Sequence, residues 1–283
     1  MKSLILSCLA LTAYGTAVNL HELNRVISKA QDNIWAELED DTWNFPTYLG
    51  TWFLSEYYFE LKALDIKNTK FNESLFTQIL LNSQLPDGSW EQVHESNLLT
   101  GVLDPTIFNY WYLKSVGENH TAPHMLRAKD WILAQGGIEA AQTMSKFKLA
   151  VFGQFHWDAL APIPLQLFYK EGPLSTAYAK DMVAQWVYPH LTALTFLRHH
   201  KTVFKQGADI RELWLREPTF FAIDEVPSDH EPHPDVLNLA HEILGVRQKR
   251  GSFGGYTIST LLSLLALQDF NDRWPHLMPD LIQ

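Results

Sequence analysis

Cysteine is nearly absent from this chain of 283 residues, in which Cys8 is the single example. A disulfide within the chain is therefore excluded, as are zinc sites built from cysteines and, outside the N-terminal arm, a cysteine nucleophile. Histidine offers no better metal site, because His230 and His233 lie in a proline-containing loop and no H-E-x-x-H segment occurs. No glycine-rich phosphate loop occurs either, so we expect neither a metal nor a cofactor.

Positive charge is scarce as well. The chain has 22 lysine and arginine residues against 32 aspartate and glutamate residues, and no basic run. A nucleic acid partner is therefore excluded, because a phosphate backbone selects a basic surface. Long apolar runs are also missing. The nearest candidate for a membrane span, residues 182–197, contains Gln185, Pro189 and His190.

The N-terminal segment, residues 1–17, reads MKSLILSCLALTAYGTA. A lysine followed by an apolar stretch that ends in small residues is typical of a short signal peptide, here cleaved after Ala17. The protein would then be secreted, and Asn72-Glu73-Ser74 and Asn119-His120-Thr121 would be candidate glycosylation triplets. The alternative is an N-terminal helix that docks on the domain. We therefore assign residues 1–19 to a signal peptide or helix, and residues 20–283 to the folded domain.

The sequence also lacks strand patterns, because alternating runs of valine, isoleucine and threonine do not occur. Helical spacing dominates instead. One predicted helix follows Asn72 as N-cap and places Leu75, Phe76, Ile79 and Leu80 on one face. A second has Asp104 as cap, Pro105 at its first position and Gly117 at its end. The sequence therefore predicts an all-α fold.

Two turns between helices share one plan, in which a glutamine is followed by a glycine and then by an aromatic residue. The first contains Gln84, Gly88 and Trp90, and the second contains Gln248, Gly251 and Phe253. Gln135 lies 51 residues after Gln84, a period typical of repeats of two helices. We interpret each turn as structural: the glutamine amide bonds backbone groups at the end of its helix, and the ring covers the preceding helix pair.

These turns resemble the QW repeat of the terpene cyclase/mutase family, which includes the squalene–hopene and oxidosqualene cyclases. Three further stretches, residues 120–137, 152–168 and 207–214, are similar to segments of that family and follow its order. The resemblance runs from about residue 20 to the C-terminus and is weakest over residues 217–235. It is greatest to the N-terminal domain of the bacterial squalene–hopene cyclases, and it implies an α-α barrel, or toroid, of helix-pair repeats.

The resemblance also implies a function: polyprenyl cyclisation in triterpenoid biosynthesis, by an isomerase (intramolecular transferase) that is attached to a membrane leaflet and acts on a squalene-like isoprenoid. The family's proton donor is an aspartate of a D-x-D-D motif in the larger domain. Neither acidic cluster here, residues 37–41 or 224–235, has that pattern. We therefore expect the chain to be inactive alone, or to need a partner chain that carries the catalytic domain. The alternatives are a non-catalytic barrel that binds an isoprenoid or a protein, and a degenerate relic.

The family's substrate cavity suggests three site residues. In the family, an S-W-x-R segment places its tryptophan at the cavity, and the corresponding positions here are Met182 and Ala184. Trp186, one turn later, could supply the missing ring. Met182, Trp186 and Val187 are therefore the cavity candidates. The alternative for Trp186 is a place in the ordinary core, as is common for a helix tryptophan.

Overall fold

The computed structural model describes residues 19–36, 38–39, 42–43, 50–68, 70–93, 101–216 and 231–282. It divides the chain into two units, residues 1–48 and 49–283, which we describe separately. Residues 1–18, with the candidate signal peptide, and residues 217–230, with His230, lie outside the described residues.

The first unit contains helix α2 (Leu20–Ala36) and a pair of two-residue antiparallel strands, β1 (Leu38–Glu39) and β2 (Thr42–Trp43). The helix begins at Leu20 because the side chain of Asn19 accepts hydrogen bonds from the backbone N–H groups of His21 and Glu22, at 3.1 and 3.3 Å. Every side chain of α2 is exposed.

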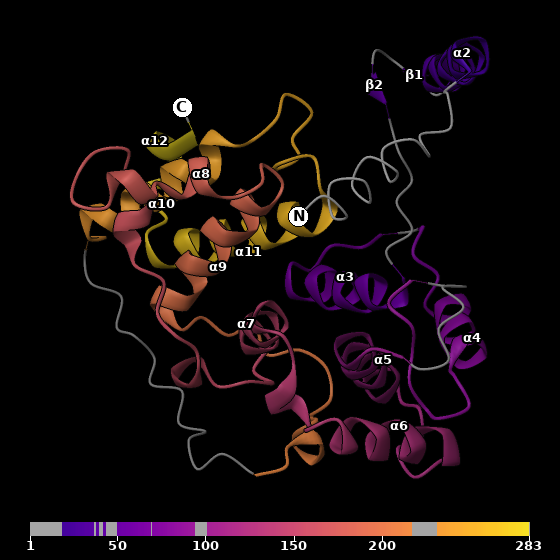
Figure 1. Cartoon of the computed structure of the whole chain (residues 1–283). Coiled ribbons are helices and arrows are strands. Elements are labelled where there is room, and N and C mark those ends of the chain that lie inside the picture. Colours follow the sequence, from indigo (N-terminus) through magenta and orange to yellow (C-terminus); the bar gives the residue numbers. More distant parts are fainter. Residues whose placement is uncertain are drawn as a thin grey trace, which may run out of the picture. The chain divides into compact units, whose positions relative to one another are not determined.

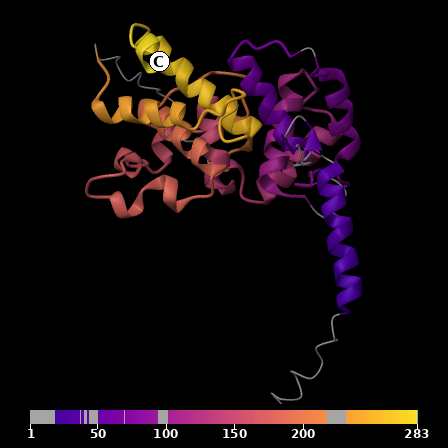
Figure 2. The ribbon, with the colours of Figure 1, turned by 90° about the horizontal axis from the view of Figure 1, so that it is seen from above.

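The second unit is helical, and the predicted all-α fold is confirmed (Figure 1 and Figure 2). Its α-helices are α3 (Thr51–Ala63), α4 (Glu73–Ser83), α5 (Leu103–Ser115), α6 (Pro123–Ala134), α7 (Thr143–Val151), α8 (Ala179–Met182), α9 (Val187–His200), α10 (Pro234–Gly245), α11 (Thr257–Arg273) and α12 (Met278–Ile282). The 3₁₀ turns are η2 (Ile138–Ala140), η3 (Trp157–Ala159), η4 (Leu165–Phe168), η5 (Ser175–Ala177) and η6 (Arg211–Leu213).

The helices of this unit close on one another. Helix α5 packs on α3 and α6, α10 packs on α9 and α11, and α9 and α11 form the most extensive helix pair. Helix α11 also packs against α3, so the last long helix of the unit contacts its first. Fully buried rings fill the centre, where Phe59 of α3 stacks on Trp111 of α5 at 3.4 Å between ring centroids.

One detail of the predicted helices is wrong. Asp104 does not cap α5, which begins at Leu103; its carboxylate instead accepts a hydrogen bond of 2.9 Å from the backbone N–H of Gln142. Helix α4 is capped by Asn72 as predicted, but it buries only part of its apolar face. Phe76 and Leu80 are buried, whereas Leu75 and Ile79 are exposed, because the unit packs on one edge of the stripe.

Within the described residues, no helix has the length and apolar composition needed to cross a membrane.

Candidate functional site

The turn after α4 holds Trp90 in the core. Gly88 has a positive φ of 96°, and a Cβ atom there would lie 2.5 Å from the backbone of Arg127, so only glycine fits. The ring of Trp90 is 1% exposed, and its Nε1–H donates to the carbonyl oxygen of Leu80 at 2.9 Å. The amide of Gln84 donates to the carbonyl oxygens of Gly88 and His124, at 2.9 and 3.0 Å. The glutamine thus joins the turn to α6 rather than closing its own helix.

The turn after α10 has the same backbone bonds. Gly251 donates to the carbonyl oxygen of Gln248 at 2.8 Å, as Gly88 does to that of Leu85 at 2.9 Å. Gln248 therefore occupies the place of Leu85 rather than that of Gln84, and its side-chain oxygen accepts a bond from a serine inside the turn. The aromatic residue, Phe253, is 2% exposed.

Each turn ends on a threonine of the following helix. The backbone N–H groups of Trp90 and Phe253 donate to the hydroxyl oxygens of Thr106 and Thr260, both at 3.0 Å. The threonines are a part of the repeated turn that the sequence reasoning missed. The threonine follows the aromatic residue by 16 positions in the first turn and by 7 in the second. The unequal spacing hid the correspondence.

The three cavity candidates lie together between α8 and α9. Met182 is the last residue of α8, Trp186 precedes α9, and Val187 is its first residue. Met182 and Trp186 are 67% and 57% exposed, and Val187 is half-buried. The alternative prediction, that Trp186 belongs to the ordinary core, is therefore wrong.

Trp186 is part of a continuous row of rings, which we call the aromatic face and define as Trp52, Phe53, Trp186 and Tyr256. Ring centroids are 6.1 Å apart for Trp186 and Tyr256, 6.2 Å for Tyr256 and Phe53, and 4.3 Å for Phe53 and Trp52. The three rings other than Trp186 are half-buried. The row joins α3 to the start of α9 and the start of α11.

The sequence of the second turn places Tyr256 in this row. Gly254 and Gly255 both have positive φ, and a Cβ atom on Gly254 would lie 2.7 Å from the ring of Pro189 in α9. The close approach of the turn to α9 therefore requires glycine. It brings Tyr256 beside Trp186, although the two residues are 70 positions apart in the chain.

Buried polar groups lie beneath the aromatic face. Lys148 of α7 lies 5.6 and 5.7 Å from the ring centroids of Trp52 and Phe53, and its ammonium group approaches the two carboxylate oxygens of Glu56 at 2.7 and 2.8 Å. Glu60, one turn after Glu56, is fully buried, and neither of its carboxylate oxygens has a hydrogen-bond partner in the part of the chain that the structure describes. Burial, followed by the neighbouring Glu56, raises the pKa of Glu60 well above its usual range.

A buried histidine completes this layer. His190 lies 5.5 Å from the ring of Tyr256, and its Nδ1 is 2.6 Å from the hydroxyl of Ser259, which also donates to the carbonyl oxygen of Trp186 at 3.3 Å. Burial, followed by the charge of Lys148, lowers the pKa of His190 to about 3, so the imidazole is neutral at physiological pH.

These groups limit the chemistry that the face can perform. A carboxyl group with a raised pKa is a weaker acid than an ordinary one, so Glu60 is unsuited to protonating an alkene. Lys148 is paired and His190 is neutral. What the surface offers is a set of ring faces, which attract a cation without forming a covalent bond to it.

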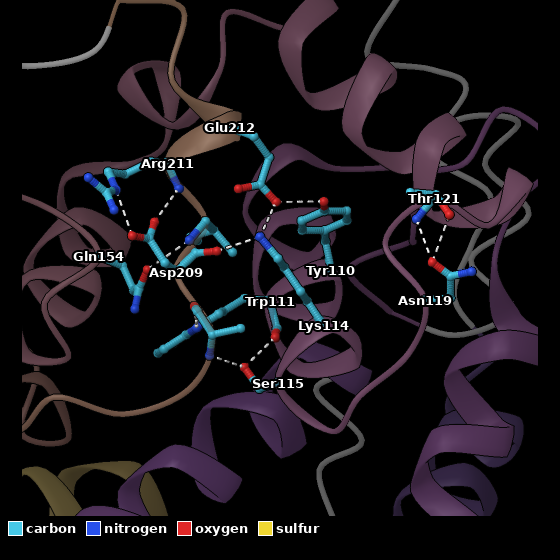
Figure 3. Close-up of polar contacts among 12 residues, drawn as sticks. Tyr110, Trp111, Lys114, Ser115, Asn119, Thr121, Gln154, Asp209, Arg211 and Glu212 are labelled. Carbon is cyan, nitrogen blue, oxygen red and sulfur yellow. Dashed lines mark hydrogen bonds and ion pairs between the residues drawn. The ribbon is translucent and has the colours of Figure 1, made fainter.

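The segment from Gly207 to Leu213 is fixed to α5 (Figure 3). Trp111 donates from Nε1 to the carbonyl oxygen of Ala208 at 2.9 Å, and Ser115 accepts from the N–H of Ala208 at 2.8 Å. Lys114 forms an ion pair with Glu212, which also accepts from the hydroxyl of Tyr110 at 2.8 Å. This network is structural, because its polar groups bond to one another.

Comparison with known proteins agrees with this architecture. The second unit is a closed all-α domain with repeated glycine–aromatic turns and a row of rings that joins α3, α9 and α11. Residues 27–250 match the family of the squalene-hopene cyclase N-terminal domain, and the chain belongs to that family.

The relatives are larger proteins. The chain is 49% identical to squalene-tetrahymanol cyclase THC1 of Tetrahymena thermophila over 286 aligned residues. The alignment covers 99% of this chain and 44% of that protein. It is 29% identical to the squalene–hopene cyclase of Zymomonas mobilis, over 72% of this chain and 31% of the relative. Sequence analysis favoured the bacterial branch, whereas identity to the Tetrahymena protein is higher. The chain spans less than half the length of these relatives.

Proposed function

We propose that this chain forms the N-terminal part of a cyclase that folds a squalene-like polyprene, and that the aromatic face is one wall of its substrate cavity. The observation that carries the proposal is the row of rings at α3, α9 and α11 in a chain that is 49% identical, over nearly its whole length, to a squalene-tetrahymanol cyclase. Met182, Trp186 and Val187 belong to this wall, together with Tyr256.

The physical reason is the charge of the reaction. Cyclisation of a polyprene moves a carbocation along the chain, and ring faces stabilise a cation by about 0.5–2 kcal/mol each. A carboxylate at the surface would trap the cation instead. Here the carboxyl groups of Glu56 and Glu60 are buried, and that of Glu56 is paired with Lys148.

The proton donor must come from elsewhere, because D-x-D-D does not occur in residues 1–283. We propose that it lies in the region that the relatives have beyond the matched part, either in the same polypeptide or in a partner chain. In this arrangement the chain encloses the substrate and supports the catalytic region, and the reaction is an isomerisation without a cofactor. Association with a membrane leaflet is part of the proposal, since the substrate is a membrane-soluble hydrocarbon.

Two assays test the proposal. In the first, squalene is incubated with the chain alone and with the catalytic region of a relative such as THC1, and cyclised products are sought by gas chromatography and mass spectrometry. Product only in the combined reaction is expected. Cyclisation by the chain alone would show that the acid is misassigned. The absence of product in both, with no binding in the second assay, would favour a non-catalytic or degenerate domain.

The second assay measures binding to the chain itself, with a squalene-like tertiary amine as the cationic probe and tryptophan fluorescence as the readout. Trp186→Ala should weaken binding by about 0.5–2 kcal/mol, or roughly 2- to 30-fold. Trp131→Ala is the matched control, because Trp131 lies on α6 and outside the aromatic face. Equal losses in both variants would contradict the assignment of the cavity wall.

A further inference from the structure

The turn between α5 and α6 carries the triplet Asn119-His120-Thr121, one of two Asn-x-Ser/Thr triplets in the chain. Asn119 and Thr121 are both exposed. The side-chain oxygen of Asn119 accepts two hydrogen bonds, from the backbone N–H of Thr121 at 3.0 Å and from its hydroxyl at 2.8 Å. Figure 3 shows the amide nitrogen of Asn119 pointing away from Thr121.

We propose that Asn119 is a site of N-linked glycosylation. In this group transfer, the Nδ2 atom of Asn119 attacks the anomeric carbon of an oligosaccharide carried on a lipid diphosphate. A C–N bond forms, the bond between that carbon and the diphosphate oxygen breaks, the lipid diphosphate leaves with the electron pair, and Nδ2 loses one proton. The host transferase supplies the catalyst, and the sugar donor is the only co-reactant. The proposal is independent of the cyclase function.

The folded turn can carry such a group without losing any contact. Its backbone is held by bonds from Glu118 N–H to the carbonyl oxygen of Leu113 at 3.0 Å, and from Ala122 N–H to that of Asn119 at 2.8 Å. Within the described residues, Nδ2 of Asn119 takes part in no hydrogen bond. An added sugar would therefore extend into solvent and leave the turn intact.

The second triplet, Asn72-Glu73-Ser74, is placed differently. Asn72 caps α4 by accepting a bond of 3.0 Å from the N–H of Leu75, and Ser74 lies in the first helical turn. Its serine hydroxyl does not bond to the asparagine. The two triplets thus give an internal comparison between a surface turn and a helix start.

The proposal requires that the chain enter the secretory pathway. Transfer of this kind takes place in the lumen of the secretory pathway, and residues 1–17 have the pattern of a signal peptide. The single cysteine, Cys8, lies within that segment. A chain cleaved after Ala17 would contain no thiol, and so could form no disulfide under the oxidising conditions of that compartment.

The experiment translates the full chain, from Met1, in the presence of endoplasmic reticulum microsomes. The product is then compared on gels before and after treatment with peptide-N-glycosidase. We expect a glycosidase-sensitive shift that is lost in Asn119→Gln and in Thr121→Ala, and retained in Thr121→Ser and in Asn72→Gln. Thr121→Ser is the conservative control, because it keeps the hydroxyl that the triplet requires.

Two results would overturn the proposal. One is the absence of any glycosidase-sensitive shift in the natural chain. The other is a shift in Asn119→Gln that is as large as that of the natural chain. Because modification is read on the newly made chain, a variant that folds poorly still gives a decisive result.

Discussion

Replacement of Glu60 by methionine should stabilise the protein at neutral pH. The side chain is fully buried, neither carboxylate oxygen has a hydrogen-bond partner in the described part of the chain, and Glu56 lies one turn before it. A buried polar group without a partner costs about 1–3 kcal/mol, and methionine has a similar unbranched shape without the polar atoms. We therefore expect the free energy of unfolding to rise by about 1–3 kcal/mol.

The gain should also depend on pH, and its sign follows from the raised pKa of Glu60. In the unfolded chain this carboxyl ionises near its ordinary value of 4.5, whereas in the folded protein it stays protonated to a higher pH. The unfolded state therefore loses its proton first, so the natural protein loses stability as the pH rises from about 4.5 through the folded pKa. The methionine variant has no such loss. The difference between the two proteins should widen over that range and then become constant.

The measurement is urea unfolding of both proteins between pH 4 and pH 8, followed by circular dichroism. Glu56→Met is the matched control, because it leaves the buried ammonium group of Lys148 without its partner. Loss of one member of a buried pair costs about 3–5 kcal/mol, so the two glutamates, one turn apart, should respond with opposite sign. Destabilisation by Glu60→Met at pH 7, or a difference that does not change with pH, would refute the assignment of Glu60 as an unpaired buried acid.

Three further substitutions test the packing, each by the same unfolding measurement. Gly207→Ala should lower the free energy of unfolding by about 2–4 kcal/mol, because φ is 70° and the new methyl group would lie 2.6 Å from the ring of Phe59. An unchanged stability would mean that the segment can move away from α5. Trp90→Phe should cost about 1–3 kcal/mol, since the carbonyl oxygen of Leu80 loses the bond from the indole N–H. A smaller loss would indicate that water, or the hydroxyl of Ser83 that also donates to this oxygen at 3.2 Å, compensates. The pKa of His190 is lowered to about 3, so the natural protein should lose stability as the pH falls below about 6.5. His190→Gln should reduce the dependence of the unfolding free energy on pH in this range. The same dependence in both proteins would contradict a buried neutral imidazole.

Local sequence signals predicted much of the fold. Asn72 begins α4 because its side chain accepts a hydrogen bond from the N–H of Leu75 in the first turn, and Gly88 marks a turn that only glycine can make. Asp104 misled the same reasoning, because its carboxylate bonds to the start of α7, a contact 38 residues away that no local pattern contains. The burial of only half the apolar stripe of α4 likewise depends on where its neighbours lie.

In the candidate site too, local sequence patterns predicted some residues, and contacts between distant parts of the chain determine the others. Trp186 was found by its position relative to a family motif, but Tyr256 was not, because its place in the row depends on the approach of the Gly254 turn to α9. Glu60 gave no signal at all. In the sequence it is an ordinary glutamate one turn after another, and only the tertiary packing of α3 buries it.

The buried polar groups behind the proposed cavity wall must not present a net negative charge to it. The layer beneath the rings contains an ion pair of Glu56 with Lys148, a neutral His190, and Glu60, whose raised pKa favours the uncharged form. Burial, followed by the nearby carboxyl groups of Glu56 and Glu60, raises the pKa of the Tyr256 hydroxyl, so both glutamates lie within electrostatic range of the aromatic face. If Glu60 were ionised, an uncompensated negative charge would lie behind the wall and hold a passing cation there. A wall that must attract a cation through its rings alone is expected to bear the cost in stability of keeping Glu60 protonated. Glu60→Met removes the acid and leaves the rings, so it should preserve binding of the cationic probe while it raises stability.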